Sequence, residues 1–264
     1  FVCSDGCVGI GVRGTNLMQY VGGKQKSGGA QIAKAINAAI VRSGATTYSE
    51  PFCGGLSVLS RIVAPVRRAS DACEALITLY TSMQNGWQPP AEMTREEWTR
   101  LRDANDATNP LTAFAGFGCS NRGNWFASYT DRYWSNDRYI TAAYAANSSL
   151  TNKLRHCASV IFTAHDYQEA TLGDIVYCDP PYAGTHGYPA VGAWNSAPFW
   201  QWIRDVAKSR PIAVSEQVAP SDFAPLLTFS IQNKIAMRTG TRRAEYLFVH
   251  ESQLQRWREL TAQA

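Results

Sequence analysis

The segment Cys178–Tyr182 carries the residue types with the most distinctive chemistry. It follows the apolar run Ile175–Tyr177, which predicts a strand that ends in a stiff loop. The carboxylate of Asp179 and the carbonyl of Pro180 are two fixed acceptors there, because consecutive prolines restrict φ. Such a pair can take both N–H groups of an exocyclic amino group on a base and leave its lone pair free. The Tyr182 ring offers a face for stacking that base. A loop that only caps a buried strand is the structural alternative.

A second group lies in the segment Tyr48–Leu59, which predicts a short strand, a glycine-rich turn and the start of a helix. Glycines at such a turn, here Gly54 and Gly55, let the backbone approach a ligand closely. Ligands of open α/β sheets bind beyond the carboxyl ends of the strands. We therefore expect this turn and the Asp179 loop to face one crevice.

Asp71 follows Glu50 by about 20 residues, the spacing at which an acidic residue holds ribose hydroxyls in a nucleotide-binding sheet. It also precedes the apolar positions Leu76, Leu79 and Tyr80, so a helix N-cap is an equally good interpretation. The two roles are compatible.

The segment Tyr20–Lys24 reads Tyr-Val-Gly-Gly-Lys and precedes a stretch in which Ile32, Ile36 and Ile40 recur every four residues. This period predicts a helix. A phosphate-binding P-loop needs two glycines four residues apart, followed by Lys-Ser or Lys-Thr. The segment Gly23–Gln25 does not supply that spacing, so we do not expect an NTPase.

In this order, Tyr-x-Gly-Gly-Lys, Glu-Pro-Phe-x-Gly-Gly, an acidic residue at a strand end and Asp-Pro-Pro-Tyr resemble the motifs of Dam-type (D12 class) adenine-specific DNA N6-methyltransferases. The resemblance runs from about Tyr20 to about His250. It implies an α/β fold with a Rossmann-like, seven-stranded methyltransferase sheet and an inserted, mainly helical target-recognition domain. The methyltransferase domain would comprise residues 1–85, with an N-terminal arm, and residues 158–264. The insertion would comprise residues 86–157.

The resemblance also implies roles for single residues and a cofactor. The catalytic loop would be Asp179, Pro180, Pro181 and Tyr182. S-adenosylmethionine would be bound by Tyr20, Lys24, Glu50, Pro51, Phe52, Gly54, Asp71, Asp166, Tyr167 and Asp179. Within that set, Asp166 and Tyr167 would border the adenine of the cofactor, although Asp166 also fits the start of a turn. No metal is required.

The region 86–157 is polar and rich in aromatic residues. Thr94–Glu97 is a capping-box sequence, which predicts a helix start, and residues 137–155 have helical spacing. The loop Gly116–Trp125 resembles a loop of phage and prophage relatives. Arginine pairs with guanine and asparagine with adenine in the major groove. The candidate DNA contacts are therefore Asn121, Arg122 and Asn124, and a packed loop with a structural tryptophan stays an open alternative.

Basic residues gather between two strand-like segments, Phe229–Gln232 and Tyr246–Val249. They predict a basic hairpin beside the site, in which Arg238, Arg242 and Arg243 contact DNA phosphates. An ordinary solvated hairpin tip is the alternative. Residues 183–189 are rich in turn formers and fit either a loop that closes over a flipped base or a plain surface loop.

The composition agrees with a globular α/β protein. The chain has 264 residues, 45% of them hydrophobic, and a net charge of +4. No apolar run approaches the roughly 18 residues of a membrane span, and the first residues lack the order of a signal peptide. These features predict a cytoplasmic protein. The resemblance implies a monomer or weak dimer that binds double-stranded DNA. The 7 cysteines are scattered, which indicates reduced, mostly buried thiols and no zinc site.

We expect direct transfer of a methyl group to N6 of an adenine flipped out of the duplex. The biological setting implied is a restriction–modification partner, a solitary phage enzyme or a host regulator. Three other functions stay open: methylation of cytosine N4, methylation of glutamine amides in proteins, and DNA binding by a protein of this fold that has lost catalysis.

Overall fold

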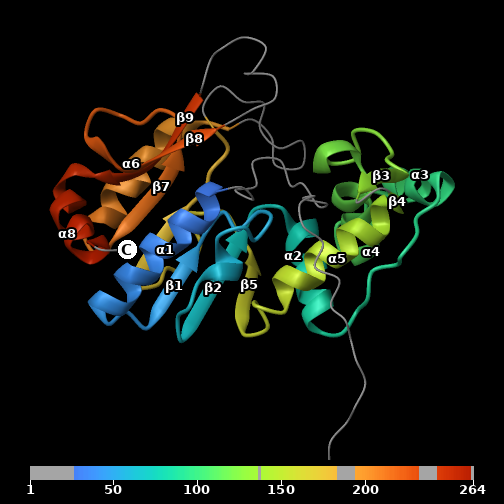
Figure 1. Cartoon of the computed structure of the whole chain (residues 1–264), viewed down its shortest axis with the longest axis horizontal. Helices are drawn as coiled ribbons and strands as arrows, with labels where there is room; N and C mark the ends of the chain where they lie inside the picture. The colour runs from blue at the N-terminus through green and yellow to red at the C-terminus, as the bar shows by residue number, and fades with distance from the viewer. Residues whose placement is uncertain (1–26, 136–137, 183–193, 232–242, 263–264) are drawn as a thin grey trace, which may run out of the picture.

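The computed structural model describes residues 27–135, 138–182, 194–231 and 243–262 (Figure 1). Seven strands form one sheet in the order β5-β2-β1-β6-β7-β9-β8. The strands are β1 (Thr47–Glu50), β2 (Val66–Asp71), β5 (Val160–Ala164), β6 (Ile175–Cys178), β7 (Ile212–Glu216), β8 (Phe223–Ile231) and β9 (Arg243–His250). The first five in this order are parallel, and β9 runs antiparallel to both of its neighbours. The predicted seven-stranded α/β sheet is confirmed.

The two faces of the sheet carry separate apolar cores. Because side chains alternate along a strand, Tyr177 belongs to a cluster with helices α1 (Ser27–Ser43), α2 (Glu74–Gln84) and α8 (Glu251–Thr261). Its neighbours in β6 belong to the opposite cluster, which contains α6 (Ser196–Ala207). A core on both faces fixes the register of the strands, and with it the position of the loops at their carboxyl ends.

The predicted helices α1 and α2 are present, with their apolar positions buried. The N-cap of α2 is Cys73, so the interpretation of Asp71 as an N-cap is wrong. Asp71 instead completes β2, where it pairs with Ala164. The helix expected after the glycine-rich turn is only the short 3₁₀ segment η1 (Leu59–Arg61), because Ile62 is already extended.

The elements between α2 and β5 lie beside the β5 edge of the sheet (Figure 1). They are α3 (Arg95–Ala104), α4 (Pro110–Ala113), the π-helix η2 (Phe114–Gly118), the 3₁₀ helix η3 (Asn121–Gly123), β3 (Arg132–Ser135), β4 (Arg138–Thr141) and α5 (Ala142–Leu154). The cap of α3 is confirmed, since the Thr94 hydroxyl accepts a hydrogen bond from the Glu97 N–H at 3.1 Å.

The helix predicted over residues 137–155 begins later, at Ala142. Residues 138–141 instead pair with β3 in an antiparallel hairpin. Thr141 ends that hairpin and is the N-cap of α5, where its hydroxyl accepts a hydrogen bond from the Tyr144 N–H at 3.1 Å.

The predicted hairpin of the last two strands is confirmed, but β8 begins at Phe223, six positions before the segment that the sequence indicated. Pro225 lies at an irregularity in the pairing with β9. A proline is tolerated there because β8 is the edge strand of the sheet.

Five of the cysteines lie in the described ranges, and all five are buried free thiols, as expected. Cys3 and Cys7 lie outside these ranges. In the part of the chain that the structure describes, no three His, Cys, Asp or Glu side chains gather as metal ligands would. None of the helices described here has the length and apolar character to cross a membrane.

Candidate active site

The carboxyl ends of β1 and β6 meet at one edge of the sheet. The two strands are parallel neighbours, with Tyr48 opposite Ile175 and Ser49 opposite Val176. Glu50 is the last residue of β1, and Asp179 directly follows β6. Their carboxylates are close enough for the charge of Asp179 to contribute to a raised pKa at Glu50. The sequence-predicted meeting of these two segments is therefore present.

Glu50 is a desolvated carboxylate. It is 2% exposed, and the Tyr48 hydroxyl donates a hydrogen bond to it at 2.7 Å. Burial is the largest cause of a pKa well above the usual range, while the Tyr48 hydrogen bond lowers it. No cation among the described residues pairs with Glu50. A buried carboxylate of this kind favours a positively charged ligand, because a countercharge offsets the cost of desolvation.

The glycine-rich turn after β1 is held by hydrogen bonds to its backbone. The Gly54 N–H donates to one carboxylate oxygen of Asp71 at 3.0 Å, and the Cys73 N–H donates to the other at 3.0 Å. The Tyr80 hydroxyl donates to the Gly54 carbonyl at 2.6 Å. Burial raises the pKa of Asp71 to about 6. An ionised carboxylate has about four lone-pair sites, so two bonds leave capacity for ligand hydroxyls.

An aromatic cluster closes one side of the turn. Phe52 stacks on Tyr167, with 5.4 Å between ring centroids and 23° between planes. Trp194, Phe199 and Trp202 contact this pair edge-on. The Tyr167 ring is thus largely buried among side chains. This cluster was not predicted from the sequence, although the spacing of Phe199 and Trp202 places both rings on one face of α6.

Asp166 begins a turn, which was the alternative to a role beside the adenine of the cofactor. Its carboxylate accepts a hydrogen bond from the Gln168 N–H at 3.0 Å, and its side chain is exposed. This turn follows β5 and so lies at the same edge of the sheet as the Glu50 and Asp179 segments.

The loop after β6 is anchored to strand β9. Pro180 is buried and Asp179 half-buried. The Tyr182 hydroxyl donates a hydrogen bond to the carboxylate of Glu245, a 6% exposed residue of β9. Burial and the neighbouring carboxylates raise the pKa of Tyr182, so it stays a neutral donor. Glu245 was also not predicted from the sequence. An acidic residue within an apolar strand was the pattern that could have indicated it.

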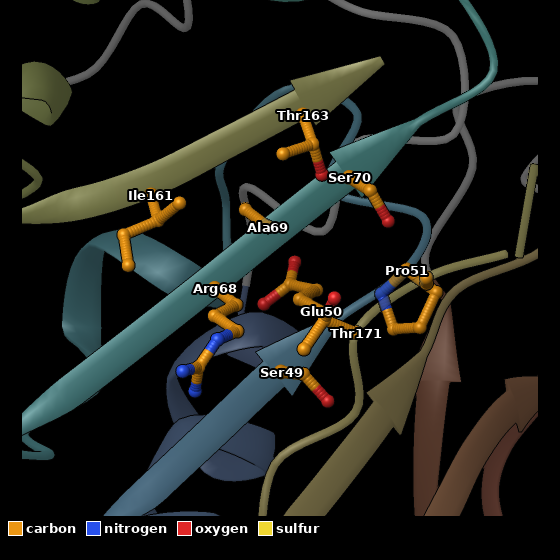
Figure 2. A pocket seen from close by; sticks show the side chains of 10 residues that line it. Ser49, Glu50, Pro51, Arg68, Ala69, Ser70, Ile161, Thr163 and Thr171 are labelled. Atoms are coloured by element: carbon orange, nitrogen blue, oxygen red, sulfur yellow. The ribbon is translucent and has the colours of Figure 1, made fainter. Parts of the chain in front are cut away.

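A small hollow lies on the sheet beside this edge. It has a volume of about 60 Å³, far below the roughly 300 Å³ of a small-molecule pocket. Figure 2 shows the side chains that β1, β2 and β5 contribute. The lining residues are Ser49, Glu50, Pro51, Arg68, Ala69, Ser70, Ile161, Thr163, Ala170 and Thr171. The hollow adjoins the candidate site through Glu50 and Pro51, and it is too small to hold a nucleoside.

Residues 20–203 match the family of D12 class N6 adenine-specific DNA methyltransferases, which covers more than half of the chain. The chain belongs to this family. No curated protein is significantly similar to the D12 class enzyme described here. Among solved structures, the rRNA methyltransferase AviRa from Streptomyces viridochromogenes is similar at 14% identity with a TM-score of 0.38, over 86% of each chain.

The D12 class enzyme presents its candidate DNA loop at the surface. Asn121 and Arg122 are exposed, and Asn124 is half-buried. Arg122 has a φ of 56° and makes no ion pair with any residue that the structure describes. The base of the loop matches the packed alternative, because Trp125 contacts the rings of Phe117 and Phe126 at 4.7 and 4.8 Å. A loop whose ends are packed against the protein can still expose its tip to DNA, so the two interpretations are compatible.

Several predicted residues lie outside the described part of the D12 class enzyme. These are the cofactor candidates Tyr20 and Lys24 and the phosphate candidates Arg238 and Arg242. Arg243 begins β9, but its side chain also lies outside the described set. Their roles, like those of the other site residues, stay predictions.

Proposed function

We propose that this D12 class enzyme transfers a methyl group from S-adenosylmethionine to N6 of an adenine rotated out of double-stranded DNA. One observation carries the proposal: the loop Asp179–Tyr182 after β6 lies next to the turn Glu50–Gly55 after β1. Family membership supplies the reaction class. The adjacency supplies a place where a donor and a base can meet.

The residues at the turn suit the cofactor. Glu50 is a buried carboxylate that no described cation neutralises, and it complements a ligand with positive charge. Asp71 retains lone pairs that can accept ribose hydroxyls. Phe52 is half-buried and lies at the same turn, stacked on Tyr167. When bound, S-adenosylmethionine supplies an electrophilic methyl group on a positively charged sulfur.

The residues after β6 orient the base. The Asp179 carboxylate and the Pro180 carbonyl accept the two N–H groups of N6 and align its lone pair with the donor. The Tyr182 ring stacks on the base, which offsets part of the few kcal/mol that flipping costs. Most of the acceleration then comes from positioning and from electrostatics in a site that excludes water.

The region 86–157 is proposed as the target-recognition unit and the remainder of the chain as the methyltransferase domain. Asn121, Arg122 and Asn124 would contact base edges in the major groove. The hairpin of β8 and β9 would place Arg238, Arg242 and Arg243 on backbone phosphates. A phage origin and a role in restriction–modification stay predictions.

The test is methylation of unmethylated duplex DNA with methyl-labelled S-adenosylmethionine, followed by digestion and chromatography of the nucleosides. The proposal predicts label in N6-methyldeoxyadenosine. Label in N4-methyldeoxycytidine would contradict the choice of base. Binding of DNA without any calorimetric heat from S-adenosylmethionine would instead identify a DNA-binding protein that has lost catalysis.

A further inference from the structure

The glycine-rich turn is held by side chains from three different elements. Asp71 of β2 binds the Gly54 N–H, and Tyr80 of α2 binds the Gly54 carbonyl. The third is Lys153 of α5, whose Nζ donates to the Gly55 carbonyl at 2.5 Å. The first two belong to the sheet and the helix that covers it. Lys153 comes from the region proposed to recognise DNA.

Lys153 lies in an unusual environment for a lysine. Burial, and then the nearby guanidinium of Arg61, lower its pKa to about 8. No carboxylate among the described residues forms an ion pair with it, and its Nζ donates a hydrogen bond to the Gly55 carbonyl. A lysine without an anionic partner normally extends its ammonium into water. Lys153 is half-buried and instead directs its ammonium to a backbone carbonyl of the glycine-rich turn.

Helix α5 connects this contact to the candidate DNA loop. In the middle of α5, the Asn147 side chain donates to the Pro89 carbonyl at 2.8 Å, which ties the helix to the entrance of the inserted region. Ala146 packs so closely on Gly118 of η2 that a Cβ there would come within 2.9 Å of it. Lys153 is at the other end of the same helix. Figure 1 shows α5 between the sheet and the other inserted elements.

We propose that Lys153 is a positioning residue through which DNA binding on the region 86–157 strengthens S-adenosylmethionine binding at the Gly54–Gly55 turn. The inference rests on the proposed function. DNA that orders the loop and η2 also orders α5, and α5 holds the Gly55 carbonyl through Lys153. The cofactor then binds a turn that is already ordered, so it loses less conformational freedom. By linkage, the cofactor strengthens DNA binding by the same factor.

The experiment measures the Kd of S-adenosylmethionine by calorimetry, with and without a saturating unmethylated duplex. The duplex contains the sequence in which the enzyme methylates adenine. For the wild type we expect the duplex to lower the Kd of S-adenosylmethionine by about fivefold or more. In Lys153→Met, which keeps the aliphatic stem, the tightening should fall below about twofold. Lys34→Met replaces an exposed lysine of α1 and should retain it. Lys153→Arg, which restores a donor, should recover part of it.

Tyr80→Phe separates coupling from simple support of the turn. It removes another hydrogen bond to Gly54, but α2 is not part of the inserted region. We expect it to weaken the cofactor equally with and without DNA. If Lys153→Met behaved in this way, or kept the full tightening, the inference would be overturned. Failure of the wild type to bind S-adenosylmethionine at all would instead refute the proposed function.

A pH series on the wild type needs no substitution, so it remains decisive if Lys153→Met fails to fold. Raising the pH from 7 to 9 removes the proton from Lys153, and the tightening by DNA should decline. The other groups that act on Lys153 are the Arg61 guanidinium and the Cys157 thiol, and burial raises the pKa of that thiol to about 11, above this range. Tightening that is constant from pH 7 to 9 would contradict the role of the ammonium.

Discussion

The hydroxyl of Tyr182 donates a hydrogen bond to the carboxylate of Glu245, although 63 residues separate the two in the chain. The bond joins the loop after β6 to strand β9. It fixes the aromatic ring that is proposed to stack on the flipped base, because the ring cannot rotate away without breaking this hydrogen bond to a buried carboxylate.

This relationship predicts graded effects at Tyr182. Tyr182→Phe keeps the ring but removes the donor, so kcat/KM should fall by up to about tenfold, in line with the roughly 0.5–1.5 kcal/mol that one hydrogen bond contributes. Tyr182→Ala also removes the stack and should lose a further factor of about ten or more. Steady-state methylation kinetics measure both. Equal activity of the two variants would show that the ring does not stack on the base.

Asp71 predicts a pH dependence of cofactor binding. Its pKa is raised by burial to about 6, so the carboxylate takes up a proton as the pH falls below that value. A protonated Asp71 loses acceptor capacity for Gly54, Cys73 and ribose hydroxyls. The Kd of S-adenosylmethionine should therefore rise between pH 7 and pH 5 in the wild type. In Asp71→Asn, binding should be weak throughout, and the change between pH 7 and pH 5 should be smaller than in the wild type.

The raised pKa of Asp71 also predicts that the free energy of unfolding decreases as the pH rises. A carboxyl group whose folded pKa is raised contributes stability below its unfolded pKa of about 3.8, and this is lost as the pH rises through about 6. From pH 4 to pH 7, the unfolding free energy of the wild type should therefore fall by about 2 kcal/mol relative to that of Asp71→Asn. Denaturant titrations at both pH values measure it, and a shift toward the wild type would contradict the account.

Gly173 packs directly against the strand that leads into the glycine-rich turn. A Cβ at this position would lie 2.8 Å from the Thr47 carbonyl carbon and 2.9 Å from its oxygen. Backbone in a central strand cannot move aside, so Gly173→Ala should lower the Tm by several degrees. Gly28→Ala in α1 is the matched control, since its Cβ meets only Phe229 at an ordinary 3.8 Å. Its Tm should be unchanged or raised.

Removing the Arg122 side chain should reduce the ability of the enzyme to discriminate between DNA sequences. Arg122→Ala should weaken binding to the methylated sequence by about tenfold, and binding to an unrelated duplex by less, because a base contact contributes ~1–3 kcal/mol of discrimination. Arg100→Ala is the control in the same region, since Arg100 is exposed but already paired with Glu97. Fluorescence anisotropy at one salt concentration measures both. Equal losses on the two duplexes would make Arg122 a phosphate contact only.

Much of the sheet could be predicted from the sequence because its signals are local. The apolar run Ile175–Tyr177 before Asp179 indicates a strand, and the four-residue period of Ile32, Ile36 and Ile40 indicates a helix. Neighbouring parallel strands then bring Glu50 and Asp179 to one edge. The residues 138–141 were misassigned because four residues fit a helix or a strand equally, and only pairing with β3 decides between them.

The supporting residues could not be predicted because they are distant in sequence from what they hold. Lys153 lies 98 residues from Gly55, and Glu245 lies on a strand that only the completed sheet brings to Tyr182. No local pattern encodes such a contact. The Asp71 N-cap failed for a related reason, since pairing with β5 extends β2 to Asp71 and moves the cap to Cys73.

The most direct test of the central claim is single-turnover methylation by Asp179→Ala, with binding of DNA and S-adenosylmethionine measured on the same preparation. Asp205→Ala, which removes an exposed carboxylate of α6, is the control. We predict that Asp179→Ala binds duplex DNA like the wild type but forms no detectable N6-methyladenine, while Asp205→Ala is fully active. Methylation by Asp179→Ala at close to the wild-type rate would contradict the account.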